Sequence, residues 1–169
     1  KSDARGVTSW YNGKVGTLNA GESDGSQMRR VTKLTKKFAR RQKWKLKTTS
    51  GICITKLVVD NFKVNTDRDD KALRETWKAI DAKLQKSTEI DHPVLDVKLA
   101  SAGDAAVTFF RDCLSDALKT LESLDKPDCT RKQAREAWDD VFDTDFFTKQ
   151  PDNRSDSNGG KGSAMKVMS

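Results

Sequence analysis

Apolar side chains recur at steps of three and four positions in four stretches of the chain, which is the spacing of a buried helix face. The four sets are Met28, Val31, Leu34 and Phe38; Leu73, Trp77, Ile80 and Leu84; Val107, Phe110, Leu114, Leu118 and Leu121; and Ala134, Trp138, Val141 and Phe142. Each set predicts one amphipathic helix, so four helices follow from periodicity alone.

Cap and turn residues give the expected limits of these helices. The first follows Asp24-Gly25-Ser26 and ends near Gln42, and the second opens at Asn65-Thr66-Asp67. The third runs over about 102–124 and is followed by Pro127, and Thr130-Arg131-Lys132-Gln133 has the pattern of a capping box before the last helix.

A fifth helix is predicted over 52–62, where the pattern is ambiguous. This run is rich in β-branched residues and fits a strand by propensity. Its length and the cap signal Thr48-Thr49-Ser50-Gly51 favour a helix buried on most sides. Residues 87–99 contain Pro93 and alternate poorly, so they are expected to form an extended linker.

These elements predict an all-α, five-helix lobe over residues 26–147, closed by Phe146 and Phe147 packing back on it. Residues 1–25 are expected to be an irregular leading segment with one short helix. Residues 148–169 are expected to be a disordered tail, because they hold too few apolar groups to offset the entropy of ordering.

Composition narrows the class of protein. A length of 169 residues suits one domain, the mean hydropathy is −0.75, and no apolar run approaches the roughly 18 residues of a membrane span. The chain begins with Lys1 and has no apolar signal region, so we expect a fragment or processed chain. Three cysteines without close spacing predict a reduced, cytoplasmic protein, and the single His92 excludes a site with several histidine ligands.

Positive charge is concentrated in one part of the chain. Residues 1–63 carry 15 Lys and Arg against 4 Asp and Glu, whereas residues 64–169 carry 17 against 21. Within 28–47 there are ten basic residues and no acidic one: Arg29, Arg30, Lys33, Lys36, Lys37, Arg40, Arg41, Lys43, Lys45 and Lys47. Like charges on one helix repel, so the pattern indicates an anionic partner, either a nucleotide triphosphate or a nucleic-acid backbone. A merely solvated basic helix is the alternative.

Ser50-Gly51 at a predicted helix start adds a second anion-binding feature, since free N–H groups and the helix dipole favour negative charge there. Lys36 and Ser50 could therefore converge on one phosphate chain. Carboxylates for two-metal chemistry are missing. Asp143 and Asp145 follow a helix among phenylalanines, and Asp67, Asp69 and Asp70 fit helix-start acids. The chain also lacks P-loop, Rossmann and zinc patterns.

Several motifs resemble the C-terminal lobe of bacterial cGAS/DncV-like nucleotidyltransferases, the cyclic-oligonucleotide synthases of antiphage signalling. They occur in order and span roughly residues 2–147. They are Ser2-Asp3-Ala4-Arg5 with Trp10, Met28-Arg29-Arg30-Val31-x-Lys33-Leu34-x-Lys36-x-Phe38, Ser50-Gly51-Ile52-Cys53-Ile54-Thr55-Lys56-Leu57-Val58-Val59, Arg68-Asp69-Asp70-x-Ala72-Leu73, His92-Pro93-Val94, and Ala137-Trp138-x-x-Val141-Phe142.

The resemblance implies that Lys36 and Ser50 contact the triphosphate of a donor NTP such as ATP or GTP, with Arg29, Arg30, Lys33, Lys37 and Arg40 as supporting cations. It implies a cyclic di- or trinucleotide synthase whose catalytic N-terminal half, with its Mg²⁺ ligands, lies outside this chain. This chain alone is then expected to be inactive. It also implies a regulatory or conjugating protein partner for the C-terminal tail.

Two other functions remain open from sequence. One is a non-enzymatic, basic helical module that binds nucleic acid, and the other is a protein-interaction module that uses the acidic helices.

Overall fold

Helices make up most of the described chain, and the predicted all-α class is confirmed. The computed structural model describes residues 3–18, 26–41, 44 and 47–151. Its elements, in chain order, are α1 (Ala4–Leu18), α2 (Ser26–Ala39), α3 (Gly51–Asn61), α4 (Asp69–Lys86), β1 (Ile90–Asp91), β2 (Lys98–Ala100), α5 (Ala105–Leu121), the 3₁₀ helix η2 (Glu122–Asp125) and α6 (Arg131–Phe142).

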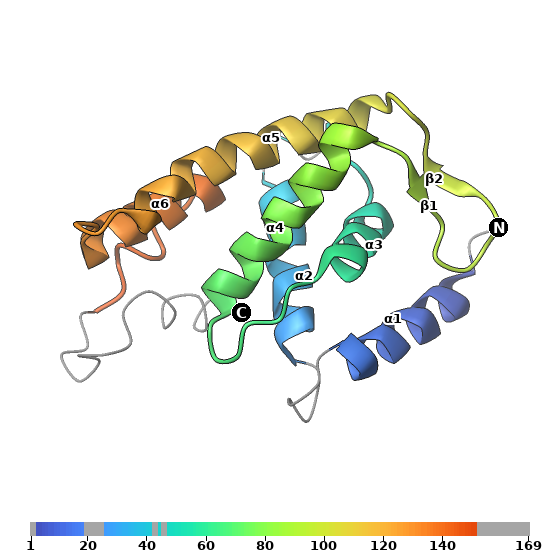
Figure 1. The fold of residues 1–169 in the computed structure, drawn as a ribbon, viewed down its shortest axis with the longest axis horizontal. Coiled ribbons are helices and arrows are strands. Elements are labelled where there is room, and N and C mark those ends of the chain that lie inside the picture. The colour runs from blue at the N-terminus through green and yellow to red at the C-terminus, as the bar shows by residue number, and fades with distance from the viewer. Residues whose placement is uncertain (1–2, 19–25, 42–43, 45–46, 152–169) are drawn as a thin grey trace.

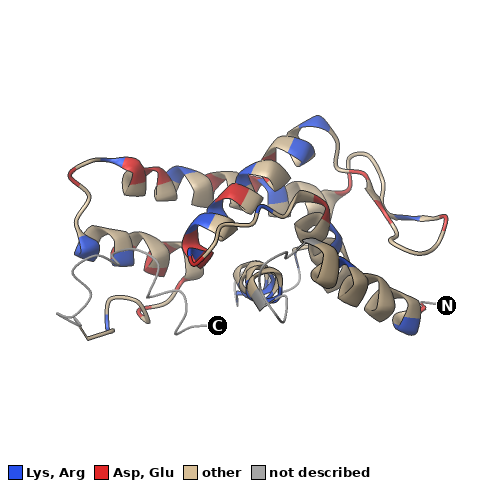
Figure 2. Cartoon of the chain, turned by 60° about the horizontal axis from the view of Figure 1, so that its bottom comes forward, with Lys and Arg blue, Asp and Glu red and all other residues tan. Residues whose placement is uncertain are grey.

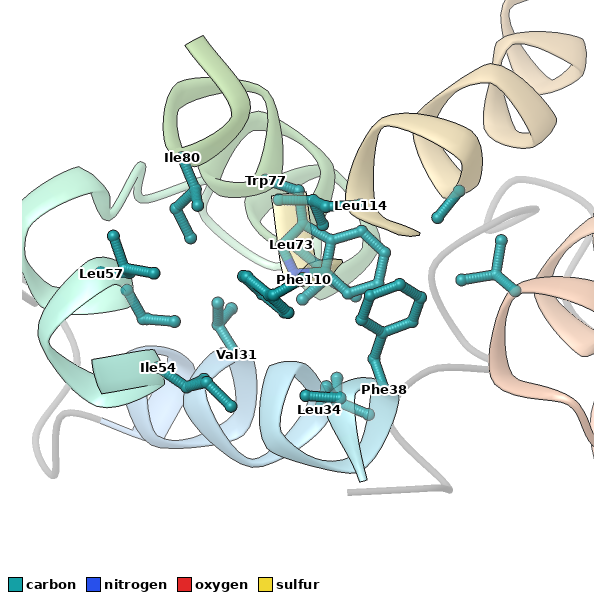
Figure 3. Close-up of a cluster of buried hydrophobic side chains, with 14 of the residues drawn as sticks. Val31, Leu34, Phe38, Ile54, Leu57, Leu73, Trp77, Ile80, Phe110 and Leu114 are labelled. Atoms are coloured by element: carbon teal, nitrogen blue, oxygen red, sulfur yellow. The ribbon is translucent and has the colours of Figure 1, made fainter. Parts of the chain in front are cut away.

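The core forms around α2, which packs against α3, α4 and α6, while α5 lies along α4 (Figure 1). Phe38 of α2 is fully buried, with its ring centroid 4.8 Å from that of Trp77 on α4. The indole N–H of Trp77 donates to the hydroxyl of Thr35 at 2.9 Å, which satisfies the one polar atom of this buried ring. Figure 3 shows the surrounding aliphatic and aromatic side chains converging from α2, α3, α4 and α5.

The ambiguous run 52–62 is helical, as predicted from its length and cap. Ser50 is the N-cap, and its hydroxyl accepts from the N–H of Cys53 at 3.4 Å. Apolar residues cover most of the circumference of α3 because it lies between α2, α4 and the hairpin strand β1. Burial on several sides removes the amphipathic pattern, which explains why periodicity alone was ambiguous.

The helix limits differ from the predictions at several ends. α2 ends at Ala39 rather than near Gln42, and Gln42 itself lies outside the described residues. α4 begins at Asp69, and its N-cap Arg68 makes no side-chain cap bond. α5 begins at Ala105 with Asp104 as its cap, and the chain then tightens into η2. The capping box of Thr130 and Gln133 is present as predicted.

Two segments differ in detail from the predictions. The short helix expected in residues 1–25 is present as α1, which is 15 residues long, and α2 to α6 are the five helices predicted for residues 26–147. Residues 87–99 are not a plain linker, because β1 and β2 pair in an antiparallel hairpin. The imidazole Nδ1 of His92 accepts from the N–H groups of Val94 and Leu95 at 3.1 and 3.0 Å, which shapes the hairpin turn.

The segment after α6 returns to the helix through polar contacts. Phe147 is fully buried, as predicted, and its N–H donates to the buried carboxylate of Asp139 at 2.8 Å. The guanidinium of Arg135 donates to the carbonyl of Gln150 at 2.8 Å. The described chain is thus held by α6 beyond residue 147, and the predicted disorder of the tail concerns residues that, from 152 onward, lie outside those described.

Candidate anion-binding site

Four cations form a single stripe along α2. Arg29, Lys33, Lys36 and Arg40 follow one another at steps of four, three and four residues, Arg40 lying one residue past the end of the helix. At about 100° per residue, all four positions fall within about 60° of the helix circumference. This stripe lies opposite the core-facing side of α2, which carries Val31, Leu34 and Phe38. Figure 2 shows α2, viewed nearly end-on, with basic and no acidic residues, whereas both signs mix on the later helices.

The C-terminal end of the stripe meets the start of α3. A methyl group built on Gly51 would lie 2.8 Å from the Nη2 of Arg40 and 3.8 Å from the Cε of Lys36. The two cationic side chains therefore lie across the backbone at the α3 N-terminus, and glycine leaves room for the guanidinium. Helix geometry leaves the first N–H groups of α3 without intrahelical acceptors, so backbone donors and both cationic side chains lie at the same helix end.

A groove continues from this point along the stripe. It has a volume of about 380 Å³ and runs between α1, α2 and α3. The residues that line it are Val7, Thr8, Tyr11, Arg29, Thr32, Lys33, Lys36 and Thr55. Lys36 belongs to both the groove and the α3 start, and it joins them into one continuous surface.

α1 is the wall of the groove, and polar contacts fix it on α2. The phenol of Tyr11 donates to the hydroxyl of Thr32 at 3.1 Å. The guanidinium of Arg29 donates to the side-chain carbonyl of Asn12 at 3.3 Å and lies 5.9 Å from the centre of the Tyr11 ring. A small apolar cluster of Val15, Met28 and Val59 anchors the other end of α1.

The ammonium of Lys36 is partly buried and lies near a second cation of the stripe. Partial burial lowers the pKa of its ammonium, and the nearby Arg40 guanidinium lowers this pKa further. Both causes disfavour the charged form in the free protein. A bound anion would reverse both, since it would neutralise the repulsion and replace the lost hydration.

Two of the predicted supporting cations lie elsewhere. Arg30 is about 100° around the helix from Arg29 and forms a bidentate ion pair with Asp69, at 2.6 and 3.0 Å. The Asp69 side chain is 1% exposed and also accepts from Gln27 at 3.2 Å, so Arg30 anchors α4 to α2. Lys37 is exposed and lies off the stripe. Arg29, Lys33 and Arg40 do join Lys36.

The sequence analysis missed the buried role of Asp69. Helix-start acids are usually solvated, and the pattern gave no reason to bury this one. Arg30 and Asp69 are 39 positions apart in the sequence, and patterns of neighbouring residues do not predict an ion pair between residues so far apart. Arg68 similarly pairs with the buried Asp70 at 2.9 Å.

The acids do not form a metal centre among the residues that the structure describes: no group of three or more Asp, Glu, His or Cys side chains converges there. The carboxylates of Asp69 and Asp70 each form an ion pair with an arginine. Asp145 is exposed and pairs with Lys149, whose hydrogen bond lowers the carboxyl pKa. Two Mg²⁺ ions therefore have no fitting ligand set within the described residues.

Comparisons with known proteins add no assignment. No protein-family model matches the chain, and a search of curated proteins likewise gave no match. Among the described residues, no helix is both long and apolar enough to cross a membrane.

Proposed function

We propose that this chain is the helical lobe of a nucleotidyltransferase that makes cyclic oligonucleotides, and that the start of α3 holds the triphosphate of the donor NTP. The approach of Lys36 to the α3 N-terminus carries the proposal. Residues 14 positions apart supply a lysine and a serine cap at the same helix start, with the Lys36 Cε 3.8 Å and the Arg40 guanidinium 2.8 Å from the Cβ position of Gly51.

Each group has a distinct part in binding. The ammonium of Lys36 acts as a point charge that can follow a phosphate oxygen, and the guanidinium of Arg40 can bind two oxygens at once. The Ser50 hydroxyl accepts from the Cys53 N–H and keeps its own proton for donation to a phosphate oxygen. These residues would bind and orient the triphosphate rather than break a bond in it.

The reaction itself would need residues outside this sequence. The described carboxylates do not fit Mg²⁺, so the proposal assigns the metal ligands to a catalytic half that is not part of these 169 residues. The resemblance of the sequence motifs to cGAS/DncV-like enzymes supports this arrangement. It also supports ATP, GTP or another NTP as the donor, and a role in antiphage signalling.

The proposal is tested by titrating the 169-residue chain with ATP and with inorganic tripolyphosphate in a calorimeter. Lys36→Ala should lower the affinity for both ligands by about tenfold or more, because a charge-assisted hydrogen bond contributes about 1.5–3 kcal/mol. The matched control is Lys37→Ala, which removes the same charge from the next position, off the stripe. Equal losses from both variants would mean diffuse attraction rather than a site, and the proposal would fail.

A further inference from the structure

The cation stripe is longer than the triphosphate site requires. Arg29 and Arg40 are 11 residues apart, which corresponds to about 16 Å along a helix. Arg29 and Lys33 lie on the side away from the α3 start, beside α1. Among the described residues, none of the four stripe cations forms an ion pair with a carboxylate, whereas the adjacent Arg30 does. A row of unpaired cations along a groove suits an extended polyanion better than a compact one.

The aromatic ring of Tyr11 lines the same groove. Trp10, which precedes it on α1, packs instead against the apolar cluster of Val15, Met28 and Val59, with the Lys56 ammonium 5.5 Å from its ring centre. A positively charged groove with aromatic side chains is the arrangement by which proteins hold single-stranded nucleic acid without reading its sequence. The groove volume of about 380 Å³ lies at the small end of ligand sites, which suits one nucleotide unit.

We propose that this face binds a short single-stranded nucleic acid, with its phosphates on Arg29, Lys33 and Lys36 and one base against Tyr11. The inference goes beyond the proposed function and does not depend on it. Lys36 is shared by the two sites, but Arg29, which the sequence predicted as a supporting cation of the triphosphate, lies about 16 Å along the stripe from Arg40, and Tyr11 lines only the groove. A single strand is favoured over a duplex because only an unpaired base can turn its face into the groove and stack on a ring there.

Salt dependence of binding is the first test. The 169-residue chain is titrated against a fluorescein-labelled ten-residue oligothymidylate by anisotropy, over a series of salt concentrations. Single strands lose affinity with a slope of about −0.7 per phosphate contact, so the three proposed contacts predict a slope of about −2. Arg29→Ala and Lys33→Ala should each make the slope shallower by about 0.7, while Lys37→Ala leaves it unchanged.

The ring is tested separately from the charge. Tyr11→Ala should weaken oligothymidylate about tenfold through lost stacking, and Tyr11→Phe should retain binding, because it keeps the ring and loses only the hydrogen bond to Thr32. Circular dichroism of each variant controls for the loss of α1. If Tyr11→Ala disturbs the helix, the effect of Arg29→Ala on the salt slope still tests the proposal, because the Arg29 side chain is exposed.

The outcomes separate this inference from the triphosphate proposal. Arg29→Ala should weaken oligothymidylate but leave tripolyphosphate binding close to that of the unmodified chain. Equal effects of Arg29→Ala and Lys37→Ala on the salt slope, or tighter binding of a duplex of the same length, would overturn the single-strand site. If tripolyphosphate does not bind but oligothymidylate binds with the expected slope, the proposed function is wrong and this inference is supported.

Discussion

At the scale of single residues, neighbours in sequence have opposite roles. Arg29 and Arg30 are adjacent, but a step of about 100° around α2 sends one to the groove and the other to the α4 start. Arg30 neutralises the carboxylate of Asp69, whose side chain is 1% exposed, and Arg29 contacts Asn12 and the Tyr11 ring. Charge alone therefore does not identify a binding residue, because its partner decides its role.

This difference predicts a large loss of stability for one substitution and almost none for the other. Arg30→Ala should lower the free energy of unfolding by about 3 kcal/mol, because it leaves a buried carboxylate without its counter-ion. Arg29→Ala should change it by less than about 0.5 kcal/mol, as expected for an exposed side chain. Urea unfolding followed by circular dichroism measures both. Similar losses from the two variants would mean that the Arg30–Asp69 pair does not hold α4 to α2.

At the scale of elements, those with local signals could be predicted. The capping box at Thr130 and the apolar stripes of α2, α4, α5 and α6 are readable because neighbouring residues carry the whole signal. The length of α1 was underestimated because Gly6, Gly13 and Gly16 lower its helix propensity, and its packing on α2 and α3 through Val15 is a tertiary contribution.

The hairpin was missed for a related reason. Its strands are only two and three residues long, too short for alternation to show, and its turn is shaped by a side chain. The bonds from Val94 and Leu95 to the His92 imidazole have no counterpart in apolar periodicity.

Part of the candidate site could be predicted from the sequence and part could not. The sequence analysis named Lys36 and Ser50, and the structure brings the two regions together at Gly51. The groove wall formed by α1 and the orientation of Arg40 could not be predicted, since both depend on how helices from distant parts of the chain pack.

The attachment of the segment after α6 gives a prediction at this scale. Asp139→Ala should lower the free energy of unfolding by about 2–3 kcal/mol, because its charged carboxylate accepts from the N–H groups of Phe147 and Thr148. The adjacent Asp140 is exposed, so Asp140→Ala should have a small effect. Chemical denaturation distinguishes the two, and an Asp139 variant as stable as the Asp140 variant would show that the Asp139 hydrogen bonds do not hold the segment.

At the scale of the whole molecule, α2 contributes to the core and also carries the cations of the proposed anion site. Its apolar side supplies Val31, Leu34 and Phe38 to the core, and the opposite side presents the cation stripe. A rigidly packed helix holds its exposed cations at fixed spacings, so less ordering is needed when an anion binds. Figure 2 shows basic residues without acidic ones on α2, whereas both signs occur on the later helices.

The central claim is that the start of α3 and Lys36 form one phosphate-binding site. The most direct measurement is the change in backbone amide NMR shifts of the ¹⁵N-labelled chain during titration with inorganic tripolyphosphate. We predict saturable shifts at Gly51, Ile52 and Cys53 that are lost in Lys36→Ala and retained in Lys37→Ala. Shifts spread evenly over the basic residues of α2 and α4, with none concentrated at the start of α3, would contradict the account.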